Sequence, residues 1–214
     1  MGGVTTAEAS LNNDNIAARV RGTTTGNWEI GLGDRVGIVG NNLEGDPWFV
    51  NTTGDDPWVA TNTYDFTLNY SSTTGLATFL VSGTGFTSTL LTTPDYDIDA
   101  YGFTGVRLGL QSRQASTLTI SDLVLNGSSI LGSYTGTTTY TTNSLYSGSV
   151  LGLIDLRGKF VMTGDSTNNG EATKFDLYLD GLTKVPTSVP EPGSLALTAL
   201  GLLGLGAIRR RKTA

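Results

Sequence analysis

Short apolar runs broken by turn residues are the feature that most restricts the fold of this chain. The runs are rich in Val, Ile, Leu, Phe, Tyr and Thr, and clusters of Gly, Asn, Asp and Ser separate them. Such spacing is typical of the strands of a sandwich or barrel. The sequence therefore predicts an all-β body. Its expected strands cover residues 16–20, 28–32, 36–39, 48–50, 65–70, 76–81, 106–110, 117–125, 150–156, 159–163 and 173–179.

The clearest predicted unit is a hairpin over residues 64–81. Its first half alternates large and polar side chains, so that Tyr64, Phe66, Leu68 and Tyr70 share one face of a strand. A turn over 71–75 then leads into a second apolar strand. Strands with one solvent-exposed face and one buried face indicate an antiparallel β-sandwich of jelly-roll or lectin-like type.

The run over 117–125 predicts a strand with an irregularity. Ile120 and Leu123 lie three positions apart, so they cannot share a face in an unbroken strand. A β-bulge at Ser121 and Asp122 would restore the alternation, and the Asn-Gly pair at 126–127 favours a turn that ends the strand.

Two missing residue types exclude much enzyme chemistry. The 214-residue chain has no histidine and no cysteine, so a Ser-His-Asp triad, a Cys nucleophile, thiolate metal sites and disulfides are absent. No glutamate stands in the Glu-x-Asp-x-Glu pattern of sandwich glucanases. The formal net charge of −6 argues against a nucleic-acid partner. We therefore expect a non-enzymatic protein without a resident cofactor, calcium being the one exception considered below.

The charge divides the chain into a body and a tail. Residues 1–189 contain nine Lys or Arg and 18 Asp or Glu, which gives −9, whereas four basic residues lie among the last six positions. Opposite charges of this kind indicate different tasks. We expect an acidic β-sandwich domain over 1–184, an extended linker over 185–189, and a separate C-terminal segment over 190–214.

The C-terminal segment has three ordered parts. Pro190, Glu191 and Pro192 come first, and an uncharged Leu/Gly/Ala run follows over 195–208. As a helix this run would be about 21 Å long, which is shorter than the ~30 Å hydrocarbon core of a bilayer. Arginine side chains that extend toward the membrane surface reduce this difference in length. The basic stop that follows would stay on the cytoplasmic side. It consists of Arg209, Arg210, Arg211 and Lys212.

These three parts together resemble the bacterial PEP-CTERM sorting signal. The resemblance implies that the protein is exported, inserted transiently in the inner membrane by the helix over 195–208, and recognised by a membrane-embedded exosortase. The resemblance also implies that this enzyme cleaves the chain near the Pro190–Glu191–Pro192 element. The resemblance further implies a bacterium that makes exopolysaccharide and a destination in the cell envelope or outside the cell. More loosely, residues 20–180 resemble the uncharacterised choice-of-anchor β-sandwich domains found ahead of such signals, which implies no activity.

A tripeptide that occurs twice in the sequence suggests a ligand-binding surface. Asp-Pro-Trp occurs twice, ending at Trp48 and Trp58. One interpretation is two turns, each followed by a buried tryptophan. The other is a pair of aromatic platforms on which sugars stack, as in a carbohydrate-binding module.

Three alternating carboxylates suggest a calcium site. On a strand, Asp95, Asp97 and Asp99 would share one face, and calcium prefers such oxygen ligands. The helical EF-hand loop is excluded, because Ala100 replaces its sixth-position glycine and Val106 its twelfth-position glutamate. A solvated acidic loop is the simpler interpretation. The main functional hypothesis is therefore a non-catalytic surface or matrix protein, with a calcium-assisted carbohydrate-binding module as the alternative.

Overall fold

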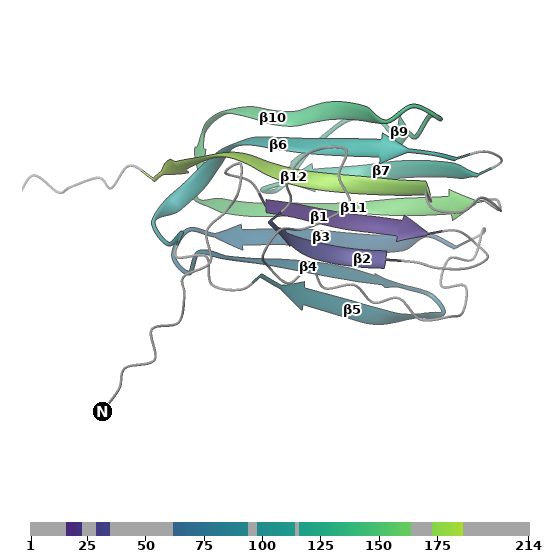
Figure 1. The fold of residues 1–214 in the computed structure, drawn as a ribbon, viewed down its shortest axis with the longest axis horizontal. Coiled ribbons are helices and arrows are strands. Elements are labelled where there is room, and N and C mark those ends of the chain that lie inside the picture. Colours follow the sequence, from purple (N-terminus) through teal and green to yellow (C-terminus); the bar gives the residue numbers. More distant parts are fainter. Residues whose placement is uncertain are drawn as a thin grey trace, which may run out of the picture.

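The computed structural model describes residues 16–22, 29–34, 62–93, 98–113, 116–163 and 173–185, and the regular elements among them are all β-strands (Figure 1). They form two antiparallel sheets. In the five-stranded sheet the order is β10 (Thr141–Leu151), β6 (Tyr101–Gln111), β12 (Thr173–Lys184), β1 (Ile16–Gly22) and β2 (Glu29–Asp34). In the seven-stranded sheet the order is β5 (Phe86–Thr92), β4 (Leu76–Gly83), β3 (Tyr64–Ser71), β11 (Leu153–Thr163), β7 (Thr117–Leu125) and β8 (Ser128–Ser129), and β9 (Tyr134–Thr135) also pairs with β7.

Aromatic rings join the two sheets through a common core. Tyr64 and Phe160 stack with ring centroids 5.2 Å apart, and both belong to the seven-stranded sheet. Phe175 comes from the five-stranded sheet and lies 5.2 Å from Phe160 and 5.1 Å from Phe66. All four rings are buried. Burial of such large side chains between the inner faces is what holds a sandwich together, and the expected antiparallel sandwich is confirmed.

The predicted hairpin is confirmed as the pair β3–β4. Tyr70 pairs with Ala77 and Phe66 with Val81, so the alternating side chains of β3 all enter the core. The turn between the strands contains Gly75, whose φ of +65° is a left-handed conformation that favours glycine. Local alternation and one glycine were enough to define this unit.

The predicted β-bulge is also confirmed. Val124 pairs with Arg157 and Ser121 pairs with Lys159, so two residues of β7 oppose one residue of β11. Asp122 has a φ of +54°, which marks the position where the strand is distorted. The expected turn follows, with left-handed conformations at Asn126 and Gly127.

The prediction of one strand over 150–156 is wrong. Strand β10 ends at Leu151 in the five-stranded sheet, and β11 begins at Leu153 in the seven-stranded sheet. Gly152 alone makes the corner, and a Cβ on it would lie 2.8 Å from Oγ of Ser72. The apolar pattern continues through the corner because Leu151 and Ile154 both pack on the same core. Sequence periodicity therefore could not reveal a change of sheet.

Other strands also differ from the prediction. Residues 159–163 are the second half of β11 rather than a separate strand, and β5 and most of β10 were not predicted. Both missed strands are rich in Thr and Ser, which also occur in turns. The strands expected at 36–39 and 48–50 lie outside the described residues.

The predicted C-terminal helix over 195–208 lies outside the described residues as well, as do the linker beyond Val185 and the rest of the tail. Within the described ranges there is no helix of the length and apolar character needed to cross a membrane.

Candidate functional site

One face of β12 contains polar side chains that are nevertheless buried. Phe175, Leu177 and Leu179 pack in the core between the sheets, so the alternating residues Asp176 and Tyr178 lie on the opposite face of the five-stranded sheet. Their exposed fractions are 0% and 2%. A buried carboxylate and a buried phenol need hydrogen-bond partners. Those partners define the candidate site.

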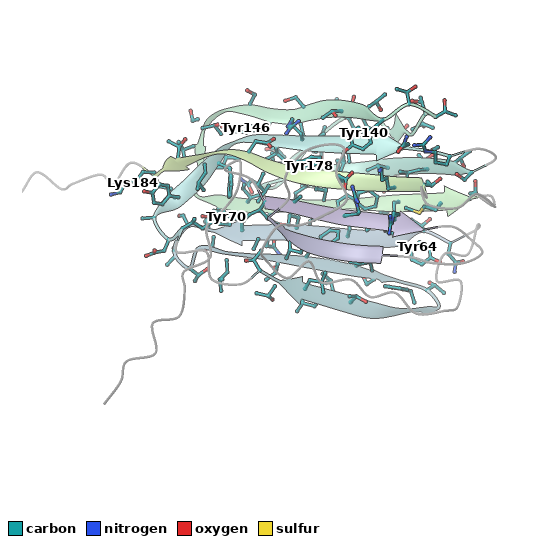
Figure 2. All side chains as sticks on the ribbon, viewed as in Figure 1. Tyr64, Tyr70, Tyr140, Tyr146, Tyr178 and Lys184 are labelled. Atoms are coloured by element: carbon teal, nitrogen blue, oxygen red, sulfur yellow. The ribbon has the colours of Figure 1, made fainter. Side chains whose placement is uncertain are left out.

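The site consists of side chains from β1, β6 and β12 and from the residue that precedes β10. Figure 2 labels two of them, Tyr140 and Tyr178, on the five-stranded sheet. We call the set the polar layer: Arg19, Arg107, Tyr140, Lys174, Asp176, Tyr178 and Asp180.

A buried ion pair connects β1 to β12. Arg19 and Asp176 are direct cross-strand neighbours in the antiparallel register. The guanidinium Nε of Arg19 donates to Oδ1 of Asp176 at 2.6 Å, and its Nη2 donates to Oδ2 at 3.2 Å. Only 5% of Arg19 is exposed. Loss of either partner would leave a buried charge with a missing counter-charge, which is strongly destabilising.

Tyr140 contacts the same carboxylate from the direction of β10, which is separated from β12 by β6. Its hydroxyl donates to Oδ2 of Asp176 at 2.9 Å and lies 3.1 Å from the hydroxyl of Tyr178. To do so, the ring crosses β6 at Gly109, where the hydroxyl occupies the space that a Cβ would need. The ammonium group of Lys174 lies 5.6 Å from the centroid of the Tyr140 ring. The missing side chain at position 109 is therefore what allows β10, β6 and β12 to share this contact.

A second ion pair lies nearer the solvent. Nε and Nη2 of Arg107 donate to the two oxygens of Asp180 at 2.5 and 2.7 Å. The guanidinium carbon is also 5.1 Å from the centroid of the Tyr178 ring, a cation–π geometry. The two side chains remain 33% and 21% exposed. This end of the polar layer is therefore more accessible to solvent than the pair of Arg19 and Asp176.

Electrostatics keep two groups of the polar layer in their ordinary protonation states. Burial, followed by the charge of Asp176, raises the pKa of Tyr140. The hydrogen bond to Asp180 raises the pKa of Arg107. Both shifts move the groups further from neutral pH, so Tyr140 stays protonated and Arg107 stays charged. The arrangement is suited to hydrogen bonding and to holding strands together, whereas proton transfer needs a pKa near the working pH.

One of the three predicted calcium ligands lies in the described part of the chain. Asp99 is exposed in a turn directly before β6, and Asp95 and Asp97 lie outside the described residues. The hydroxyl of Tyr70 donates to the carbonyl oxygens of Tyr101 and Ile98, at 2.8 and 3.3 Å, on either side of that turn. Among the described residues, no three acidic side chains gather closely enough to hold a metal ion.

The other predicted site residues lie outside the described residues. These are Trp48 and Trp58, Asp95 and Asp97, the motif Pro190, Glu191 and Pro192, and the basic stop Arg209, Arg210, Arg211 and Lys212. The calcium and sugar-stacking interpretations therefore stay predictions.

Sequence reasoning missed the polar layer. A signal was present, because Asp176 interrupts an otherwise apolar strand and Arg19 interrupts another. Alternation places each on a face that is usually solvated. That the two meet across strands 157 positions apart in the sequence follows only from the register of β1 against β12.

Comparison with known protein families matches residues 188–212 to the PEP-CTERM protein-sorting motif. The match begins three residues after the last described residue, Val185, and includes none of the described strands. No curated protein matches the chain. The motif supports an exported protein that is sorted by exosortase to the cell envelope or surface.

Proposed function

We propose that this chain is a non-catalytic surface or extracellular-matrix protein, in which the β-sandwich is the cargo and the tail is removed by exosortase. The observation that supports the proposal is the match of residues 188–212 to the sorting motif. In this account the helix over 195–208 holds the protein briefly in the inner membrane. The basic residues Arg209 to Lys212 keep the end of the chain in the cytoplasm.

The polar layer agrees with a structural role for the body. Its described ion pairs join Arg19 with Asp176 and Arg107 with Asp180, and the pKa values of Tyr140 and Arg107 are shifted away from neutral pH. Such a body suits a domain that must remain folded outside the cell without disulfides, since the chain has no cysteine.

Intact-mass spectrometry of the extracellular protein tests the processing. The chain is expressed with an exosortase and compared with a variant in which Pro190, Glu191 and Pro192 are all alanine. We expect the unaltered chain to end near this motif and the variant to keep its tail. Pro186→Ala is the matched control, because it removes a nearby proline outside the motif and should leave processing unchanged. Extracellular protein of full mass, with residues 195–212 present, would contradict the proposal.

Membrane fractionation separates cleavage from permanent anchoring. If exosortase removes the tail, the unaltered chain leaves the membrane fraction and the alanine variant stays in it. An unaltered chain that stays in the membrane fraction with its tail attached would instead indicate a tail-anchored envelope protein.

A second candidate function is carbohydrate binding, for which the exopolysaccharide of the producing cell is the natural ligand. It is favoured by the Asp-Pro-Trp echo, since Trp48 and Trp58 lie in the connection between β2 and β3. Exposed tryptophans in such a connection can stack on sugar rings. Calcium held by Asp95, Asp97 and Asp99 would assist by bridging to sugar hydroxyls.

Glycan binding by the Trp48→Ala and Trp58→Ala variants tests this second function. Binding should fall about tenfold or more for each variant, since one stacked ring contributes about 1–3 kcal/mol by analogy with base stacking. Trp28→Ala is the control at the remaining tryptophan. A chelator should reproduce the loss if calcium participates, and unchanged binding in both variants would exclude the proposed platforms.

A further inference from the structure

Strand β10 forms an open edge of the five-stranded sheet. It pairs with β6 on one side, and no other described strand pairs with its second side. Figure 1 shows it along one margin of the sandwich, with no labelled strand beyond it. An edge of this kind presents unpaired backbone N–H and C=O groups, to which another strand can bind.

The other sheet edges are shorter than β10, and two of them lie close to each other across the sandwich. Strand β5 also has no charged residue and no proline, so its length and its contact with β2 are what distinguish it from β10. On the side of the sandwich where β10 lies, the seven-stranded sheet ends in β8 and β9, which are only two residues long. At the opposite side, β5 and β2 approach each other from the two sheets. Strand β10 has 11 residues, and none of them is charged or proline. Lysine, proline and shortness are the usual devices against edge pairing, and β10 lacks all three.

The absence of charge restricts which partner this edge fits. Residues 1–189 have a net charge of −9, so two copies of the body repel each other over most of their surface. At β10 the exposed side chains include Thr142, Ser144 and Ser147, which are neutral and can hydrogen-bond to their own kind. A strongly basic or acidic partner would find no complementary charge along this strand. The edge therefore suits a second copy of the same chain.

The register of β10 defines the segment that can pair. Its pairing with β6 is regular from Thr141 to Ser144, shifts once before Tyr146, and becomes irregular after Ser147. Residues 141–147 are thus the part of β10 that pairs with β6 with a single register shift, and Ser144 lies at the centre of this segment. In an antiparallel pair of identical segments, the central residue faces its own counterpart.

We propose that two copies of this protein pair through β10, antiparallel about a two-fold axis near Ser144, so that their five-stranded sheets become one continuous sheet. Backbone hydrogen bonds between the two β10 strands supply the contact, and the neutral side chains of both copies line it. This association is separate from sorting, because it uses the body alone.

Charge substitution at Ser144 tests the pairing in the full-length chain. Ser144→Lys places two ammonium groups against each other, and Ser144→Glu places two carboxylates. Each variant should raise the dimer dissociation constant about tenfold or more, as measured by analytical ultracentrifugation, because like charges directly opposite on paired strands repel. An equimolar mixture of the two variants should recover the association, since opposite charges then face each other.

Ser88→Lys is the matched control, since Ser88 is an exposed serine on β5, the edge strand of the other sheet. It should leave the dissociation constant unchanged. Association driven by the apolar tail would persist in Ser144→Lys and would overturn the proposal, as would a chain that is monomeric at about 1 mM. If Ser144→Lys fails to fold, Ser144→Cys supplies the second test, because the chain has no other cysteine and the two thiols would face each other across the axis. A disulfide-linked dimer should form on oxidation, and its absence would overturn the proposal.

Discussion

The hydroxyl of Tyr140 lies 2.9 Å from Oδ2 of Asp176, and the two residues belong to opposite sides of strand β6. The tyrosine ring spans β6 above Gly109 to make this contact. One side chain thereby ties the start of the edge strand β10 to the centre of the sheet. The same carboxylate also accepts hydrogen bonds from Arg19 on β1, so Asp176 joins elements on both of its sides.

Tyr140→Phe tests the hydroxyl of this contact while keeping the ring. The free energy of unfolding should fall by about 1–3 kcal/mol, because a buried charged acceptor loses one of its donors. Urea denaturation followed by circular dichroism measures it. Tyr146→Phe is the control, since that hydroxyl donates to the carbonyl of Ser149 at an exposed position, and its loss should cost under about 0.5 kcal/mol. Equal effects of the two variants would contradict the importance assigned to the Asp176 contact.

Gly109→Ala tests the space beneath the ring of Tyr140. A methyl group at position 109 would occupy the place of the tyrosine hydroxyl, so the ring must move and the protein should lose about 1–3 kcal/mol of stability. Gly105→Ala, on the same strand, provides the comparison. A Cβ there would have its nearest neighbour at 3.5 Å, an ordinary contact. A neutral effect of Gly109→Ala in chemical denaturation would show that Tyr140 does not need this position open.

The buried pair of Arg19 and Asp176 should respond very differently to single and double substitution. Asp176→Leu alone leaves the guanidinium buried without this carboxylate and should cost about 3–5 kcal/mol. Adding Arg19→Met replaces the pair by apolar side chains and should recover a large part of that loss. A double-mutant cycle from urea denaturation measures the coupling. Additive effects would mean that the two side chains do not stabilise each other.

The stability of the protein should depend on Tyr70 at alkaline pH. Burial, and secondly the charge of Asp99, raise the pKa of Tyr70 from 10.0 to about 12. The folded state therefore favours the protonated phenol more than the unfolded state does. This stabilisation is fully present below pH 10.0 and is lost as the pH rises through about 12.

Ultraviolet titration of tyrosinate, combined with denaturation at each pH, checks this prediction. Tyr70→Phe should remove part of the alkaline decline in stability, and Asp99→Asn should lower the pKa of Tyr70. Tyr101→Phe is the control, because Tyr101 is exposed and belongs to the same turn region. A Tyr70 that titrates like an exposed tyrosine would contradict the buried hydrogen bonds to Ile98 and Tyr101.

The parts of the fold that were predicted depend on neighbours in the sequence. The β3–β4 hairpin followed from the alternation of Tyr64, Phe66, Leu68 and Tyr70, because strand geometry places every second side chain on one face. The bulge near Asp122 followed from a break in the same alternation. The corner at Gly152 did not, since the chain changes sheets there while its side chains continue to face one shared core.

The sequence by itself determined the antiparallel strand class, the hairpin, the bulge and the C-terminal sorting motif, because each is written in contiguous residues. Only the tertiary structure decided the polar layer and the open edge at β10. Arg19 finds Asp176, and Tyr140 passes over Gly109, through strand order and register, which depend on packing between distant segments. Strand order also places the uncharged β10 at the edge of the sheet, where the lack of charge leaves it able to pair with another strand. The sequence alone does not show that β10 is an edge strand.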